Sequence, residues 1–237
     1  MKQVAEAAGV SEEDILGHDL FLYNRMEGTV WGAEKEFVSA AKIDDCECAL
    51  GGLLGFLKGR KEEHITVYAM FDNEEVGSQT RQGAGSTFLA DVLTRISENL
   101  GDTASVYQMR LADSYMISAD NGHAVHPNHP EKTDPTNRPV LNGGILLKFS
   151  ANQRYTTDGL SAAMFKSICK EADVPFQIFF NRSDMLGGST LGNISTSQVP
   201  FNTADIGLTQ LAMHSSYETA GVKDFDYLVR FAEKLFA

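Results

Sequence analysis

The amino-acid sequence predicts an α/β fold in which a mostly parallel, mixed sheet carries helices on both faces. Two observations support this prediction: apolar segments of strand character alternate with segments of helical periodicity, and polar loops follow the strand-like segments. With 237 residues, of which 43% are hydrophobic, the chain can bury a large core. We therefore expect one dominant α/β domain.

The first part of the chain contains four recognisable segments. An amphipathic helix opens at the N-terminus, and Ser11 followed by three acidic residues is typical of a helix start. Residues 21–32 alternate loosely between polar and apolar side chains and predict extended structure, whereas residues 45–60 have the length and apolar content of a buried helix. Residues 65–71 are rich in β-branched and aromatic side chains, which predicts a central strand that ends in a polar loop.

The rest of the chain continues this alternation. A serine cap, apolar residues at helical spacing and a final glycine predict a helix over residues 86–100. Further strands are expected at residues 115–119, 144–149 and 175–180, and further helices at residues 159–172 and 222–236. The last helix repeats apolar side chains every three or four residues, as expected for a helix packed against a sheet.

Composition excludes several classes of protein. A net charge of -12 and a pI near 4.9 disfavour nucleic acid and anionic membranes as partners. The sequence contains neither the apolar run of a signal peptide nor a membrane-spanning segment. Three cysteines, two of them in Cys46-Glu47-Cys48, form neither a disulfide framework nor a zinc knuckle. We therefore expect a cytoplasmic location.

The densest chemical signal is the segment DNEEVGS, in which Glu74 and Glu75 follow the strand predicted at residues 65–71. Two like charges at the end of an apolar strand are unfavourable unless a positive group lies nearby. Neighbouring residues of an extended chain point to opposite sides, so one glutamate can bind a metal while the other faces a substrate. The alternative interpretation is a solvated acidic turn.

A second signal follows the strand predicted at residues 115–119. Asp120 ends this strand, and His123 and His126 lie shortly after it. Carboxylate and imidazole groups suit zinc, manganese or cobalt. A polar loop with hydrogen-bonded histidines is the alternative.

Two further candidates are weaker when taken alone. Asp44 precedes a predicted helix, where an acid commonly interacts with the helix dipole, and His214 follows an apolar segment, where a lone histidine is more often structural. Both nevertheless lie near the ends of predicted elements. Open α/β sheets place their ligand sites there.

The joint occurrence of these motifs resembles the aspartyl aminopeptidase-type family of dinuclear zinc metallopeptidases. The resemblance runs from about Leu20 to the C-terminus and is carried, in order, by IDD, DNEEVGS, SADNGHAVHPN, NGGILLKFSANQRYTTD, GGSTLGNI and MHSSYE. It implies a zinc exopeptidase-like fold and a hydrolase that removes the N-terminal residue, usually Asp or Glu, from short peptides. It also implies a homo-oligomer.

The resemblance implies a role for each matching residue. Asp44 matches an aspartate that bridges two metal ions, Glu75 and His214 match the other ligands of one ion, and Asp120 matches a ligand of the second. Glu74 matches the general base that takes a proton from the attacking water. Zinc is the expected metal, and manganese and cobalt are alternatives.

The same resemblance implies a cis peptide bond between Asp44 and Asp45, and it suggests residues that face the substrate. His123 and His126 match histidines that line the family's active site, and His123 is expected to polarise the scissile carbonyl. We expect Lys148 and Asp184 to contact the substrate's side chain or free amine. The alternative for these two is an ordinary surface charge.

The sequence also departs from the family pattern. The family's upstream HxD ligand motif and most of its inserted dimerisation domain have no match here. We therefore interpret residues 1–38 as a remnant of that domain and residues 39–237 as the catalytic core, incomplete at the N-terminus. One metal site would keep only Asp44 and Asp120 and is expected to be weak.

This departure leaves two interpretations of function open. The chain is either an aminopeptidase core with low activity on its own or a catalytically impaired, truncated subunit that serves as an assembly module. We expect its partner to be a second copy of the chain or a complementing N-terminal segment.

Overall fold

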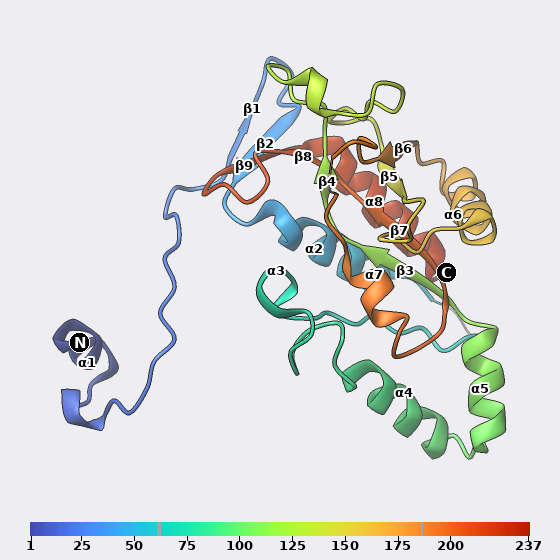
Figure 1. Cartoon of the computed structure of the whole chain (residues 1–237), viewed down its shortest axis with the longest axis horizontal. Coiled ribbons are helices and arrows are strands. Elements are labelled where there is room, and N and C mark those ends of the chain that lie inside the picture. Colours follow the sequence, from blue (N-terminus) through green and yellow to red (C-terminus); the bar gives the residue numbers. More distant parts are fainter. Residues whose placement is uncertain (61–62, 186) are drawn as a thin grey trace.

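The computed structural model describes residues 1–60, 63–185 and 187–237, which form two sheets and several helices, some of which pack against the sheets (Figure 1). The helices are α1 (Lys2–Ala8), α2 (Ile43–Lys58), α3 (Glu74–Gly77), α4 (Phe88–Asn99), α5 (Ala104–Ala112), α6 (Gly159–Ala172), α7 (Leu191–Ser195) and α8 (Val222–Leu235), with 3-10 turns η1 (Glu12–Asp14) and η2 (Pro130–Lys132). The strands are β1 (Thr29–Trp31), β2 (Phe37–Ala40), β3 (Tyr115–Ala119), β4 (Gly122–His123), β5 (Ile145–Phe149), β6 (Phe176–Phe180), β7 (Asn202–Gly207), β8 (Thr209–Leu211) and β9 (Glu218–Gly221). The predicted α/β class is confirmed.

The central sheet has the strand order β3-β7-β5-β6, with parallel pairs at both ends and an antiparallel pair in the middle. Ile206 of β7 packs on one face with Phe165 of α6 and Phe231 of α8. Asp205 points to the opposite face, because strand side chains alternate, and Gly192 of α7 lies against it. Helices therefore cover both faces, as predicted.

A second, mostly antiparallel sheet has the order β1-β2-β9-β8-β4. Of the extended residues predicted at 21–32, only β1 forms a strand. Strand β2 leads directly into α2, and it pairs with β9 through Ala40 and Glu218. This pairing brings the first turn of α2 close to the loop between β8 and β9.

The strand predicted at residues 65–71 is wrong. These residues form no regular secondary structure and join no sheet, and β3, at the edge of the central sheet, pairs only with β7 among the described strands. A strand requires a hydrogen-bonded neighbour as well as suitable side chains. The segment instead lines a cleft of about 1440 Å³, whose other walls include β3, α2 and α8.

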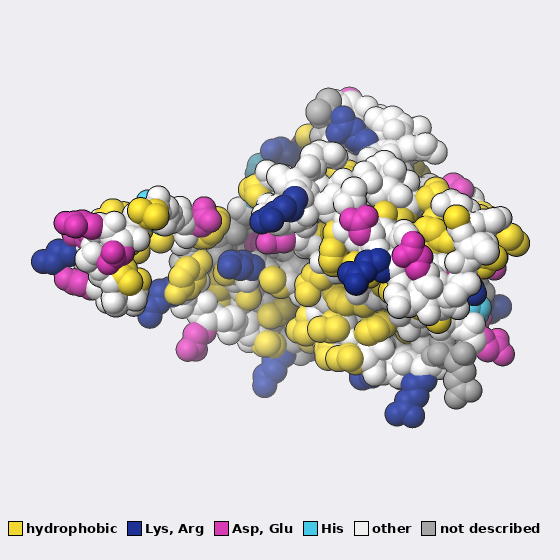
Figure 2. Space-filling view, turned by 90° about the horizontal axis from the view of Figure 1, so that it is seen from below, with side chains coloured by type: hydrophobic (Ala, Val, Ile, Leu, Met, Phe, Trp, Pro, Cys, Tyr) yellow, Lys and Arg dark blue, Asp and Glu magenta, His cyan; other side chains and the backbone are white. Residues whose placement is uncertain are grey.

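Hydrophobic side chains remain exposed around this cleft. Ile65 and Met70, which line it, are 55% and 61% exposed. Figure 2 shows hydrophobic side chains gathered on the underside of the molecule as drawn in Figure 1. This face is therefore less well covered than the core between the sheet and α6 and α8.

The N-terminal residues 1–28 contain only α1 and η1 and run away from both sheets (Figure 1). Ser11 directly precedes η1, so a short helical turn starts where the sequence predicts one; the Oγ and the backbone N–H of Ser11 donate hydrogen bonds of 2.7 and 3.2 Å to the Asp14 carboxylate, and the serine hydroxyl accepts no backbone N–H of the described residues as a cap. Within the described residues, no helix combines the length and apolar character needed to cross a bilayer.

Candidate metal centre

Asp44, Glu75 and His214 meet in space although they are far apart in the sequence. Nε2 of His214 lies 3.2 Å from Oδ2 of Asp44 and 2.7 Å from Oε1 of Glu75. The Asp44 side chain is 4% exposed, whereas those of Glu75 and His214 are 54% and 60% exposed. Asp44 thus forms the floor of the cluster, and the other two form its mouth.

Unusual backbone conformations occur at or near each of these residues. The peptide bond between Asp44 and Asp45, in the first turn of α2, is cis, as the family resemblance implies. Asn73, at φ 59°, precedes the short helix α3 that carries Glu75, and His214 itself has φ 64°. Left-handed conformations of this kind change the chain direction abruptly.

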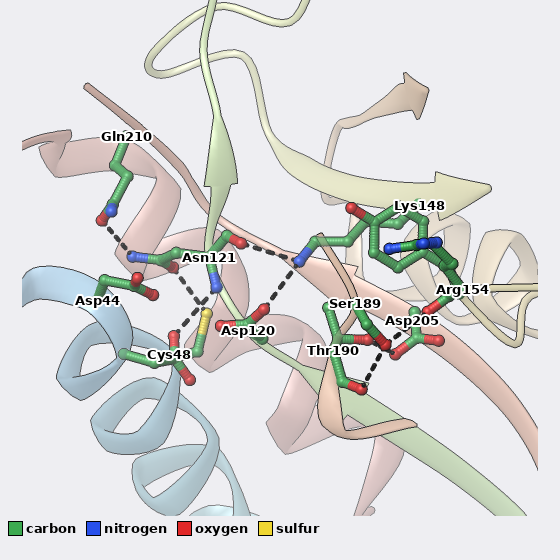
Figure 3. A network of polar contacts seen from close by, with 12 residues as sticks. Asp44, Cys48, Asp120, Asn121, Lys148, Arg154, Ser189, Thr190, Asp205 and Gln210 are labelled. Atoms are coloured by element: carbon green, nitrogen blue, oxygen red, sulfur yellow. Dashed lines mark hydrogen bonds and ion pairs between the residues drawn. The ribbon is translucent and has the colours of Figure 1, made fainter. Parts of the chain in front are cut away.

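Asp120 approaches the same floor from the end of β3. The structure places ligand atoms of Asp44, Asp45 and Asp120 within 4.8 Å of one another. On its other side, Asp120 Oδ2 lies 3.3 Å from Nζ of Lys148 (Figure 3). We call Asp44, Glu75, Asp120 and His214 the candidate site.

Lys148 lies beneath the candidate site. It is 1% exposed, and its Nζ also donates a 2.8 Å hydrogen bond to the carbonyl oxygen of Asn121 (Figure 3). The interpretation of Lys148 as an ordinary surface charge is therefore wrong. Burial lowers the pKa of this lysine, but Asp120 and other nearby groups raise it overall, so that the ammonium stays charged.

A buried polar network, which the sequence analysis missed, holds the floor of the candidate site. Its centre is Asn121, which accepts a 2.9 Å hydrogen bond from Sγ of Cys48 and donates one of 2.9 Å to Gln210 (Figure 3). The backbone N–H of Asn121 also donates to Asp45. This side chain therefore joins α2 to β8.

The candidate site concentrates negative charge. Burial raises the pKa of Asp44 to about 7, and the charges of Asp120, Glu75 and Glu218 contribute. For His214, partial burial lowers the pKa, but Glu75 and Asp44 raise it overall. A fold that holds several carboxylates together provides a favourable place for a cation.

The residues present fit a divalent metal ion. Oδ1 of Asp44 is buried and has no hydrogen-bond partner among the described residues. Such an unsatisfied carboxylate oxygen is unfavourable, and coordination to a cation would satisfy it. Carboxylate oxygens together with an imidazole nitrogen form a donor set that zinc accepts.

Glu74 and His123 lie beside the candidate site. Burial, followed by the negative charges of Asp120 and Glu75, raises the pKa of Glu74 to about 7. His123, in β4, is exposed at its surface, but partial desolvation of its ring and then the positive charges of Lys148 and His214 lower its pKa. It is therefore neutral near pH 7.

His126 and Asp184 make local contacts in the described part of the chain. Nδ1 of His126 accepts a 3.1 Å hydrogen bond from the backbone N–H of Asn128. Asp184 forms an exposed ion pair of 2.6 Å with Arg182. Neither contact connects these two residues to the candidate site.

A family model and several known proteins match this chain. The model described as "Aminopeptidase I zinc metalloprotease (M18)" matches residues 1–236. The probable M18 family aminopeptidase 2 of Clostridium novyi is 46% identical over 227 residues, which cover 96% of this chain and 52% of that protein. The aspartyl aminopeptidase of Caenorhabditis elegans is 40% identical and is matched over 92% of this chain and 47% of its own length.

A solved structure shows the same fold. The Saccharomyces cerevisiae mApe1 dodecamer matches with a TM-score of 0.82 and 30% identity, over 99% of this chain and 53% of that chain. The chain thus spans about half the length of the relatives that it matches.

Proposed function

Because the chain belongs to the M18 family of aminopeptidase I zinc metalloproteases, we propose that it is the catalytic core of a metal-dependent aminopeptidase. The observation that carries this proposal is the convergence of Asp44, Glu75 and His214, whose ligand atoms all lie within 4.8 Å of one another. Two carboxylates and an imidazole from three distant segments form a suitable set for a zinc ion that must also leave room for substrate.

Each residue of the candidate site has a proposed role. Asp44, Glu75 and His214 would hold one zinc ion, and Asp44 and Asp120 would hold a second ion more weakly. A bound divalent cation lowers the pKa of water and polarises a peptide carbonyl. The chain's own contribution to this site is to hold ionised oxygen ligands on a buried floor.

Glu74 is the proposed general base. It is adjacent to the proposed ligand Glu75 but is not itself a proposed ligand, so it can interact with a water molecule. Its pKa of about 7 suits proton transfer at neutral pH. We propose that it takes the proton from the attacking water and returns it to the leaving amine. His123, which is neutral near pH 7, would donate a hydrogen bond to the scissile carbonyl.

We propose N-terminal Asp or Glu as the preferred substrate residue, on the basis of the family and the name of the C. elegans relative. The buried ion pair with Asp120 favours a positioning role for Lys148 over a direct contact with the substrate. His126 and Asp184 stay predicted substrate residues. A cytoplasmic location likewise stays a prediction.

We further propose that a second polypeptide segment completes the fold. The outer edge of β3 has no strand partner among the described residues, and residues 65–71 face it across the cleft. An extended apolar segment inserted there could pair with both. A homo-oligomer is also proposed, since a related structure is a dodecamer.

The test is to titrate the purified chain with zinc and to assay it against peptides that begin with Asp, Glu, Ala or Leu. Stoichiometric zinc binding together with preferential release of Asp or Glu is the expected result. Zinc binding without any hydrolysis would favour the alternative, an impaired subunit with the same fold. Absence of zinc binding at saturating metal would contradict the proposed centre.

A further inference from the structure

We propose that Glu218 positions Asp44 and His214 by binding the backbone amide of each with a different carboxylate oxygen. Oε2 of Glu218 accepts a 2.9 Å hydrogen bond from the N–H of Asp44, and Oε1 accepts one of 2.8 Å from the N–H of His214. This inference rests on the proposed function, because it concerns two of the ligands proposed there.

Glu218 lies where the segments that carry these two residues converge. It is the first residue of β9, and its side chain is almost completely buried, with the residue only 2% exposed. In the sheet it pairs with Ala40 of β2, which leads into α2 and Asp44. The loop with His214 ends at Glu218 itself, so one side chain connects both segments.

The chemistry of this contact requires a carboxylate of this length. An ionised carboxylate only accepts hydrogen bonds, so each of its two oxygens can take one amide hydrogen. Such charge-assisted bonds are stronger than neutral ones. A glutamine would accept one N–H, but its own NH₂ group would then face the other amide hydrogen.

The two hydrogen bonds fix backbone positions from which the ligand side chains project. Asp44 and His214 come within 3.2 Å of each other through Oδ2 and Nε2. A change in either backbone would alter that separation. Residues that orient metal ligands in this way commonly contribute 10–100-fold to metal affinity.

Glu218 also adds a negative charge near the candidate site, and this charge alone would attract a cation. Position and charge can be separated by two substitutions. Glu218→Gln keeps the length of the side chain and removes the charge, whereas Glu218→Asp keeps the charge but is too short to reach both amides. If position matters, both variants lose affinity.

Asp224 provides a matched control. It is a fully buried carboxylate that accepts hydrogen bonds from the backbone N–H groups of Asn142 and Gly144, at 2.6 and 2.8 Å, and from Thr209. None of these partners belongs to the candidate site. Asp224→Asn therefore makes the same kind of change without touching a proposed ligand.

The experiment measures the zinc dissociation constant of each variant by competition with a chromogenic chelator, together with its melting temperature by circular dichroism. We expect Glu218→Gln and Glu218→Asp to weaken zinc binding by about 10–100-fold. Asp224→Asn should lower the melting temperature but leave the dissociation constant unchanged. If Glu218→Gln does not fold, Glu218→Asp tests the same expectation.

Three outcomes would overturn this inference while leaving the proposed function in place. These are wild-type affinity in Glu218→Gln, wild-type affinity in Glu218→Asp, which would assign the effect to charge, and an equal loss in Asp224→Asn. If the wild-type chain binds no zinc, the proposed metal centre fails, and this inference fails with it.

Discussion

Lys148 places Nζ 3.3 Å from Oδ2 of Asp120, and both side chains are largely removed from solvent. The lysine comes from β5 in the central sheet, whereas the aspartate follows β3 at its edge. The two groups therefore link the packed core of the sheet to the candidate site. Removing one partner of such a pair leaves the other as a buried, uncompensated charge.

Replacing Lys148 by Met is expected to destabilise the chain by roughly 3–5 kcal/mol, the usual cost of breaking a buried ion pair. For a chain of this size the melting temperature should fall by about 10 °C. Thermal melts followed by circular dichroism measure this change. Lys223→Met, at an exposed position, is the control and should have little effect; equal melting temperatures for the two variants would refute the structural role.

Replacing Glu74 by Gln should remove the proposed general base while preserving the shape of the side chain. Peptide hydrolysis is expected to fall by about 10²–10⁴-fold, and the zinc dissociation constant should not change. The measurements are initial rates on an N-terminal Asp peptide and a zinc titration of the same preparation. Glu98→Gln, on the exposed face of α4, is the matched control, and hydrolysis by Glu74→Gln at the control's rate would exclude this role.

Replacing His214 by Ala should remove one proposed zinc ligand. Zinc affinity is expected to fall by more than the roughly 10–100-fold that loss of an outer supporting group produces. Isothermal titration with zinc measures the effect. His129, an exposed histidine in a loop beside η2, supplies the control His129→Ala. If both variants bind zinc as the wild type does, His214 is not a ligand.

The stability of the zinc-free chain should fall as the pH rises. Burial raises the pKa of Asp44 and Glu74 to about 7, that of Glu47 to about 8 and that of Asp224 to about 6. In the unfolded chain these carboxyl groups titrate near pH 4. The folded state therefore binds more protons than the unfolded state between about pH 4 and pH 8, and stability decreases through that window.

His214, in the candidate site, and His123, beside it, add opposite contributions. The raised pKa of His214 acts in the same direction as the carboxyl groups, whereas the lowered pKa of His123 opposes them mainly below about pH 6.5. In the presence of a chelator, the melting temperature should thus be higher at pH 6 than at pH 8. Saturating zinc should reduce this difference, because the metal replaces protons on the carboxylates; a chelated chain that melts higher at pH 8 would contradict the assignment.

The sequence predicted those helices and strands that can be recognised from the apolar pattern and end signals of their own residues. Helices α2, α4, α6 and α8 and strands β3, β5 and β6 lie within a few residues of their predicted ranges. Strand β7 was not predicted, because Thr203 and Asp205 interrupt its apolar pattern. The structure compensates these buried polar groups with hydrogen bonds, including one from Thr190 to Asp205.

Residues 65–71 show the opposite error. Their β-branched and aromatic side chains have strand propensity, but propensity does not provide a neighbouring strand, and none is paired with them in the described chain. Strand identity there depends on long-range pairing that local sequence does not encode. The family resemblance, rather than periodicity, was the source of the expected residue roles.

The close approach of Asp44, Glu75 and His214 agrees with what the motifs suggested. The residues that support them, such as Glu218, were not predicted. Glu218 was part of the MHSSYE motif, and its spacing of four residues from His214 was the available signal. Nothing in the sequence indicated the ion pair between Lys148 and Asp120, because a lysine in a strand is usually solvent-exposed.

The hydrogen bond between Asp44 and Glu218 spans 174 positions of the chain. During synthesis, Asp44 emerges from the ribosome long before Glu218, so the segments that form the proposed metal centre cannot yet meet. Metal binding at the proposed centre is consequently expected only after Glu218 has been synthesised. Zinc uptake should therefore report on closure of the entire fold rather than on any early folding nucleus.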